Sequence, residues 1–252
     1  MLTATFQSDL SNNGFAVLAA IFSAEHVDSI IQTLEKAFQS DANGSTLRSA
    51  DGAVYGARNL LQLCPPVATL WMQSPLPTIL SDVLGPRFGL VRVLYFDKPP
   101  EQSWALPWHK DMAIAVKDNR LASAQFTHPT TKIGVPHVEA PEWLLEMMLT
   151  LRLHLDDMTE ENGPLKVLPG SHRGDESGNP VSILGCQGDV LIMRPLLSHC
   201  SIRSKDGTTR HRRILHCEFS GVEELPDGYS WHDFVQIDSG TMTGKSTASP
   251  IR

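Results

Sequence analysis

Residues 105–116 read ALPWHKDMAIAV and place two ionisable side chains, His109 and Asp111, at the mouth of an apolar run. Ionisable groups cost free energy in such a position unless a partner compensates for the lost water. In an extended strand, residues two apart project to the same side of the chain, so the imidazole and the carboxylate would lie together. The stretch therefore predicts a polar site built on a hydrophobic β framework.

Short β-type segments follow one another on both sides of this stretch, from about residue 89 onward. Gly, Pro, Asn and Asp separate them, which is typical of an all-β sandwich or barrel. The connection across residues 117–145 is long, and long ordered connections often serve as lids or binding loops. The β-type segments are LVRVLYF (90–96), AIAV (113–116), LTLRLHL (149–155), LKVLPG (165–170), DVLIMR (189–194), SHCSI (198–202) and RRILHCEF (212–219).

The N-terminal part of the chain has helical rather than strand periodicity. In residues 22–38, FSAEHVDSIIQTLEKAF, apolar residues recur at helical spacing, and Ser23 stands where an N-cap is expected. Residues 67–85 predict a second helix, broken near Pro75 and Pro77. The chain therefore combines a helical part with a β part.

The composition fits an ordinary globular protein, with 41% hydrophobic and 19% charged residues among 252. That length suits one large domain. We predict a single, mainly β domain with flanking helices over residues 1–252. Its parts are a helical layer at about 15–88, a β-core at about 89–222 and a C-terminal tail at 223–252, of which SGTMTGKSTASPIR (239–252) is expected to be loosely ordered.

Charge and cysteine usage limit the partners and the compartment. The formal net charge of −7 disfavours nucleic acid, although RSKDGTTRHRR at 203–213 is a local basic exception. The four cysteines lack CxxC spacing, and the first residues lack the features of a signal peptide. No apolar run reaches the roughly 18 residues of a membrane span. We expect a cytoplasmic protein with neither a membrane nor a nucleic-acid partner.

The HKD tripeptide offers two side chains that can bind a metal ion. One imidazole and one carboxylate at this spacing can occupy two adjacent positions around a metal ion, with a third ligand from elsewhere. Two histidines and one carboxylate on one face suit non-haem Fe(II) that activates dioxygen. Taken alone, the tripeptide is common enough by chance that an ordinary surface pair is an equal alternative.

Several motifs in the same order resemble the phytanoyl-CoA dioxygenase family of Fe(II)- and 2-oxoglutarate-dependent oxygenases. The resemblance runs from roughly residue 12 to 220. It implies a double-stranded β-helix core, the jelly-roll of the cupins, with an N-terminal helical layer. The motifs are VRVLYFDKPP (91–100), PWHKD (107–111), HLDDMTEENGPLKVLPGSH (154–172), GDVLIMRPLLSH (188–199) and RRILH (212–216).

The resemblance also implies an activity and its partners. The enzyme would use Fe(II), 2-oxoglutarate and dioxygen to hydroxylate an unactivated C–H of a small molecule, releasing succinate and CO2. Desaturation, epimerisation or cyclisation would use the same ligands and stays open. So do two rivals: a non-catalytic β-barrel binding module, and a cupin-like metalloenzyme that needs no 2-oxo acid. The primary substrate is not identified.

Carried over to this chain, the resemblance implies three iron ligands, His109, Asp111 and His199. Halogenating relatives replace the carboxylate with a small residue, so Asp111 argues against halogenation. An arginine on the strand after His199 would anchor the far carboxylate of 2-oxoglutarate, because a guanidinium matches a carboxylate bidentately. Matching RRIL selects Arg212, whereas the usual spacing from His199 selects Arg210, and strand alternation would put both on one face. We predict Arg212, with Arg210 second.

Two further residues enter the predicted cosubstrate site. Ser201 matches a hydroxyl position that helps to hold 2-oxoglutarate in relatives, with an ordinary strand serine as an equal alternative. Arg152 should share a strand face with His154 and Asp156, where an unpaired charge would be costly. It would either contact the cosubstrate or an anionic substrate, or form a structural pair with Asp156, and we prefer the structural pair.

Overall fold

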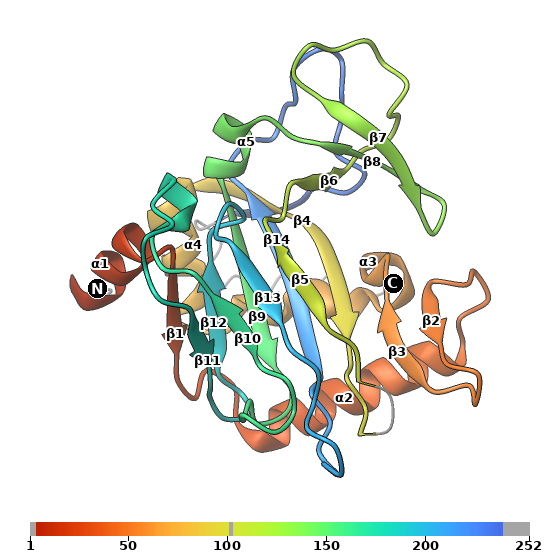
Figure 1. Ribbon diagram of the computed structural model, residues 1–252. Coiled ribbons are helices and arrows are strands. Elements are labelled where there is room, and N and C mark those ends of the chain that lie inside the picture. The colour runs from red at the N-terminus through yellow and green to blue at the C-terminus, as the bar shows by residue number, and fades with distance from the viewer. Residues whose placement is uncertain (1–3, 101–102, 239–252) are drawn as a thin grey trace, which may run out of the picture.

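Two antiparallel β-sheets face one another in the computed structural model, which describes residues 4–100 and 103–238 (Figure 1). The larger has the order β1-β12-β9-β14-β4-β3-β2, with β15 also paired to β4, and the smaller has the order β11-β10-β13-β5. Strands distant in sequence alternate in each sheet, as in a jelly-roll, so the predicted fold class is confirmed. The larger sheet contains β1 (Phe15–Leu18), β2 (Thr46–Arg48), β3 (Val54–Ala57), β4 (Arg87–Phe96), β9 (Met148–His154), β12 (Val190–Met193), β14 (Ile214–Ser220) and β15 (Val235–Asp238). The smaller contains β5 (Leu106–His109), β10 (Leu165–Val167), β11 (Val181–Ile183) and β13 (His199–Ser201).

The central strands of the larger sheet have one apolar and one polar face. In β14, Leu215, Cys217 and Phe219 belong to the hydrophobic core, whereas His216 and Glu218 line a cavity between the sheets. Strand β9, and β4 beyond the register shift at Val91, follow the same alternation and send Arg152 and Arg92, among others, into that cavity. The period of two therefore separates the core from the site.

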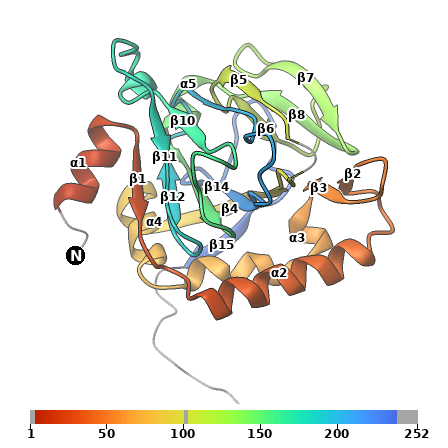
Figure 2. The same ribbon diagram turned by 60° about the horizontal axis from the view of Figure 1, so that its bottom comes forward.

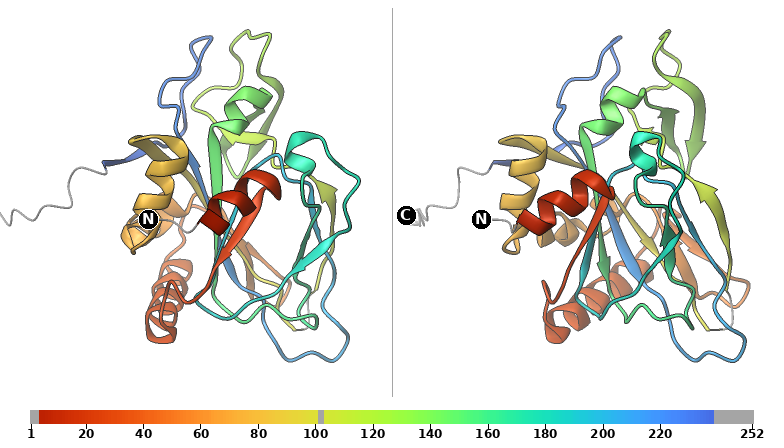
Figure 3. Two further views of the ribbon diagram at one scale, coloured as in Figure 1. Left: turned by 90° about the vertical axis from the view of Figure 1, so that its left-hand side faces the viewer. Right: turned by 60° about the vertical axis from the view of Figure 1, so that its left-hand side comes forward.

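Helices cover the apolar face of the larger sheet, so that it lies between them and the smaller sheet (Figure 3). The longest helix, α2, runs from beneath β1 toward the β2–β3 hairpin (Figure 2). Its predicted cap is confirmed, because the Ser23 hydroxyl accepts a hydrogen bond from the His26 amide. None of the helices within the described ranges is long and apolar enough to cross a lipid bilayer. They are α1 (Ala4–Asn12), α2 (Ala24–Gln39), α3 (Leu60–Leu63), the 3-10 helix η1 (Pro65–Met72), α4 (Leu76–Leu84), α5 (Glu142–Glu146) and the 3-10 helix η2 (Ser171–Arg173).

The two ends of the chain add strands to the larger sheet. Residues 15–88 are not purely helical, because β1, β2 and β3 join that sheet. In the C-terminal tail, β15 pairs with β4, and Trp231 is buried in a second hydrophobic cluster. The segment expected to be loosely ordered, 239–252, lies outside the described residues.

The connection at 117–145 has its own secondary structure and is not a plain loop. Strands β7 (Thr127–Lys132) and β8 (Val135–Glu139) form a hairpin, to which β6 (Ala113–Ala115) adds a third strand. This small sheet projects beyond one end of the two main sheets (Figure 1). Its hairpin turn reaches the cavity through Lys132.

Trp71 provides a test of the interface between the helices and the larger sheet. Its side chain is fully buried and meets the Phe219 ring edge-on, with 5.4 Å between ring centroids. Trp71→Ala should lower the free energy of unfolding by about 3–5 kcal/mol, since it leaves a large cavity. Urea-induced unfolding measures this. The neighbouring Met72 is 57% exposed, so Met72→Ala should have little effect, and equal losses would contradict the packing described.

Candidate active site

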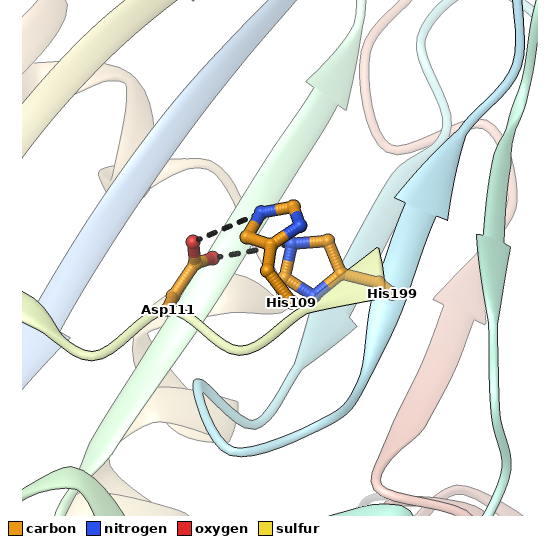
Figure 4. A group of neighbouring side chains, drawn as sticks. All are labelled: His109, Asp111 and His199. Atoms are coloured by element: carbon orange, nitrogen blue, oxygen red, sulfur yellow. Dashed lines mark ion pairs between the residues drawn. The ribbon is translucent and has the colours of Figure 1, made fainter. Parts of the chain in front are cut away.

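Pairing between β5 and β13 brings two histidines together that are distant in sequence. His109 ends β5, His199 begins β13, and the two residues are direct cross-strand partners. Their ring centroids lie 4.2 Å apart. Asp111 follows two residues after His109, outside the strand, and its backbone amide donates to the Pro195 carbonyl at 2.9 Å. Figure 4 shows its carboxylate beside both rings. We call His109, Asp111 and His199 the triad.

Hydrogen bonds fix which ring nitrogen of each triad histidine is free. Nδ1 of His109 lies 2.8 Å from the Pro107 carbonyl oxygen, and Nδ1 of His199 lies 2.8 Å from the Leu197 carbonyl oxygen. A carbonyl only accepts, so both Nδ1 atoms carry hydrogen, and in the neutral form of each ring it is Nε2 that has the lone pair. These Nε2 atoms lie 3.8 and 3.6 Å from the Asp111 carboxylate oxygens, too far for hydrogen bonds.

The donor set of the triad fits a divalent metal ion. One ligand atom from each residue lies within 4.8 Å of the others, and Asp111 Oδ2 is buried without a hydrogen-bond partner. Burial lowers the pKa of His199 to about 4, which keeps its ring neutral at pH 7. Burial also raises the pKa of Asp111, but the neighbouring imidazoles outweigh this effect and lower it to about 2. Neutral imidazoles and an ionised carboxylate are the forms that bind metal.

The triad lies on a cavity of about 460 Å³ between the two sheets. This volume is typical of small-molecule sites. The smaller sheet contributes the two triad histidines and Ser201, whereas the larger sheet contributes Arg92, Arg152, His216 and Glu218. The cavity therefore joins the candidate metal ligands to a set of charged side chains.

The structure distinguishes the two arginines predicted as anchors for 2-oxoglutarate. Arg212 is 2% exposed and lines the cavity, and its Nε has no hydrogen-bond partner. Arg210 lies outside the cavity, with its side chain 52% exposed and within 4 Å of carboxylates of Asp157 and Glu161. The prediction that both share one strand face is wrong, because β14 begins only at Ile214.

The preferred structural pair between Arg152 and Asp156 is also wrong. The Asp156 carboxylate accepts two hydrogen bonds from the Arg213 guanidinium, at 2.9 and 2.6 Å. Strand β9 ends at His154, so the alternation that would align Asp156 with Arg152 does not continue. Arg152 instead lines the cavity, where burial lowers its pKa to about 10.

Lys98 is a buried cation that the sequence reasoning missed. Its Nζ donates to the Ser201 hydroxyl at 3.0 Å and to the Ile202 carbonyl at 2.5 Å. Burial, together with Arg212 and Arg152, lowers the pKa of Lys98 to about 6. Lys98 stands in the DKPP segment, two residues beyond Phe96 of β4, and extending the strand alternation would have pointed it inward.

A second missed group lies behind Asp111. His216 Nε2 is 3.9 Å from Asp111 Oδ2 and 3.2 Å from Glu218 Oε1. Arg92 in turn grips the Glu218 carboxylate with Nε and Nη2, at 2.9 and 2.5 Å. The sequence signal was the polar alternation within the strand HCEF, which reads equally well as an ordinary sheet face. This chain of contacts reaches Asp111 from the larger sheet.

A known family matches most of the chain. The family model for phytanoyl-CoA dioxygenase (PhyH) matches residues 10–212, which include the whole triad. Among curated proteins, the L-proline trans-4-hydroxylase of Streptomyces griseoviridis is 31% identical over 130 residues, or 50% of this chain. Those residues are 38% of that relative, so the match spans less than half of the hydroxylase.

Solved structures share the fold at low sequence identity. Iron-bound EctD from S. alaskensis superimposes with a TM-score of 0.66 at 20% identity, over 87% of this chain and 76% of EctD. HygX from Streptomyces hygroscopicus, with nickel and 2-oxoglutarate bound, gives a TM-score of 0.59 at 17% identity, over 87% of each chain. The jelly-roll architecture is therefore shared well beyond the range of close sequence similarity.

Metal binding tests the triad directly. His199→Ala removes one of three donors, so the affinity for Mn(II) measured by titration calorimetry should fall by roughly a hundredfold or more. His172→Ala is the matched control, because that ring lies outside the triad, with Nε2 3.2 Å from the Ser11 carbonyl oxygen. Circular dichroism checks that both variants fold. Unchanged affinity in His199→Ala would remove this residue from the site.

Proposed function

Because the chain belongs to the phytanoyl-CoA dioxygenase family, we propose that it is an Fe(II)- and 2-oxoglutarate-dependent dioxygenase. The reaction we propose is hydroxylation of an unactivated C–H of a small molecule, with release of succinate and CO2, by a single domain over residues 1–252. The triad beside a cavity with buried cations is the observation that carries this proposal. The reaction named for the relative, L-proline trans-4-hydroxylase, supports hydroxylation over the other outcomes.

The triad would hold the metal. His109 and His199 offer Nε2 while their Nδ1 atoms are held by backbone carbonyls, and Asp111 offers a carboxylate oxygen. When bound, Fe(II) and 2-oxoglutarate supply the oxidative decarboxylation that activates dioxygen. Three protein ligands on one side would leave room for the cosubstrate. His216 and Glu218 act as positioning residues, because they restrain the Asp111 carboxylate from the side of the larger sheet.

Three buried cations would bind the cosubstrate. We define Lys98, Arg152 and Arg212 as the inner cations. None of them has a carboxylate within 4 Å in the part of the chain that the structure describes, and each is buried. Two buried guanidinium groups without a directly contacting carboxylate, beside an amine whose pKa is lowered to about 6, are unfavourable, and a dianion such as 2-oxoglutarate would compensate them.

We assign separate roles to the inner cations. The free Nε of Arg212 suits it to grip the far carboxylate as a fork, and Ser201, which lines the same cavity, would add a hydroxyl. Lys98 Nζ donates to Ser201, and it would add positive charge from behind when protonated next to the bound dianion. Arg152 would contribute a second guanidinium on the side of β9. Arg210 has no role in this assignment, because it is exposed.

An anaerobic titration distinguishes the proposal from its two rivals. Adding Fe(II) and then 2-oxoglutarate to the protein should produce a weak visible charge-transfer band, and exposure to air should then yield succinate. A non-catalytic binding module, or a metalloenzyme that needs no 2-oxo acid, would give neither signal. Absence of both the band and succinate would overturn the proposed function.

Arg212 and Arg210 should differ sharply in the same titration. Arg212→Gln removes a buried charge-assisted contact, so the Kd for 2-oxoglutarate should rise roughly a hundredfold. Arg210→Gln should change it by less than about twofold, since exposed charges contribute little. The charge-transfer band reports both values. The opposite ranking would show that Arg210 is the anchor.

Binding of 2-oxoglutarate should be accompanied by proton uptake at Lys98. With its pKa lowered to about 6, Lys98 is neutral in the free protein at pH 8, and a neighbouring dianion would favour its ammonium form. Affinity should therefore fall as the pH rises above 6. Calorimetry at pH 8 under anaerobic conditions, in two buffers of different ionisation enthalpy, measures the uptake. Lys98→Met should abolish it, and equal heats for the wild type in both buffers would contradict this role.

A further inference from the structure

A second group of cations lines the cavity apart from the inner cations. It consists of Arg58, directly after β3, Arg92 on β4 and Lys132 at the end of β7, and we call these residues the outer cations. Burial and the nearby Arg92 lower the pKa of Arg58. Burial, Arg92 and Arg58 lower the pKa of Lys132. Glu218 raises the pKa of both residues and Asp111 raises that of Lys132, but burial and the neighbouring cations outweigh these carboxylates.

Only one outer cation has a carboxylate partner. Glu218 pairs with Arg92 through two hydrogen bonds. The side chains of Arg58 and Lys132 are half-buried and form no hydrogen bond or ion pair with residues 4–100 or 103–238. Placing two such cations in one cavity is unfavourable unless an anion contacts them directly.

The backbone holds these two cations in place. Asn59, next to Arg58, donates from Nδ2 to the carbonyl of Ile133, next to Lys132, at 3.3 Å. Both linking residues have left-handed backbone, with φ of 55° at Asn59 and 48° at Ile133. This conformation is costly for a β-branched isoleucine, and such strain tends to persist at functional sites.

The charge of the cavity remains positive after cofactor loading. Its lining includes Arg58, Arg92, Lys132, Arg152 and Arg212, but only two carboxylates, Asp111 and Glu218. A sixth lining cation, Lys110, donates a hydrogen bond from its ammonium to the Ser171 carbonyl. Fe(II) and dianionic 2-oxoglutarate carry equal and opposite charge, so loading leaves the cationic excess unchanged. This excess is notable in a chain whose net charge is −7.

We propose that the primary substrate is a small anion whose carboxylate or phosphate group is held by Arg58 and Lys132, with its reacting C–H toward the triad. This inference rests on the proposed function, because that function assigns the inner cations to 2-oxoglutarate. A guanidinium fork and a nearby ammonium are a suitable pair for either oxyanion. Tyr55 and Leu47 of the β2–β3 hairpin line the same cavity and provide contact surface for the uncharged part of the substrate.

Calorimetry on the anaerobic protein loaded with Fe(II) and saturating 2-oxoglutarate tests the proposal. The probes are inorganic phosphate and a panel of small carboxylic acids, each paired with its primary amide. At least one acid or phosphate should bind, and the amide of a binding acid should bind at least roughly tenfold more weakly. Binding by acids alone identifies a carboxylate substrate, whereas binding by phosphate identifies a phosphate substrate.

Variants connect this binding to the outer cations. Arg58→Gln and Lys132→Gln should each weaken binding of the anion by roughly tenfold or more, and Arg58→Lys should restore part of the loss. Arg87→Gln and Lys117→Gln are matched controls, because both residues are exposed and neither lines the cavity. They should leave the affinity unchanged.

Three results would overturn the proposal: amides that bind as tightly as their acids, Arg58 and Lys132 variants that keep full affinity, or no binding by any anion. The charge-transfer band distinguishes failure of the substrate assignment from failure of the proposed function. If the band forms and anion binding fails, the substrate assignment alone is wrong. If the band is absent, the proposed function itself is wrong.

Discussion

The period-two alternation of β9, β14 and β4 is the constraint on which the rest of the molecule depends. One face of these strands is apolar and packs beneath the helices, so the fold is stable only in the register that turns the other face inward. That inward face carries Arg92, Arg152, His216 and Glu218. A shift of one residue would exchange core for cavity. The hydrophobic core and the charged site are therefore fixed by the same pairing of strands.

The smaller sheet brings two imidazoles together without a hydrogen bond between them. Cross-strand pairing of His109 with His199 sets their separation, and carbonyls two residues earlier in the chain orient the rings. Both histidines use the same local device, a contact from Nδ1 to the carbonyl of residue i−2. The geometry of the triad thus comes from backbone pairing, which is stiffer than side-chain contacts alone.

Local sequence signals predicted much of this arrangement, and long-range pairing determined the remainder. The helix capped by Ser23 and the HKD motif depend on neighbours within a few residues, and motif order indicated the jelly-roll. The partner of Asp156 was predicted wrongly because it depends on where β9 ends, which pairing with β12 and β14 decides. Lys98 was missed for a related reason. Its burial follows from contacts with Ser201 and Ile202, more than 100 residues away.

The cost of building this cavity falls on its polar atoms. Among buried side-chain atoms without a hydrogen-bond partner in the protein are Arg92 Nη1, Asp111 Oδ2, Arg212 Nε and His216 Nδ1, which all belong to residues lining the cavity. A buried polar atom that nothing satisfies costs about 1–3 kcal/mol. The apolar face of the same strands supplies compensating burial beneath the helices. Ligands that satisfy these atoms would bind more tightly for that reason, and their binding would stabilise the fold.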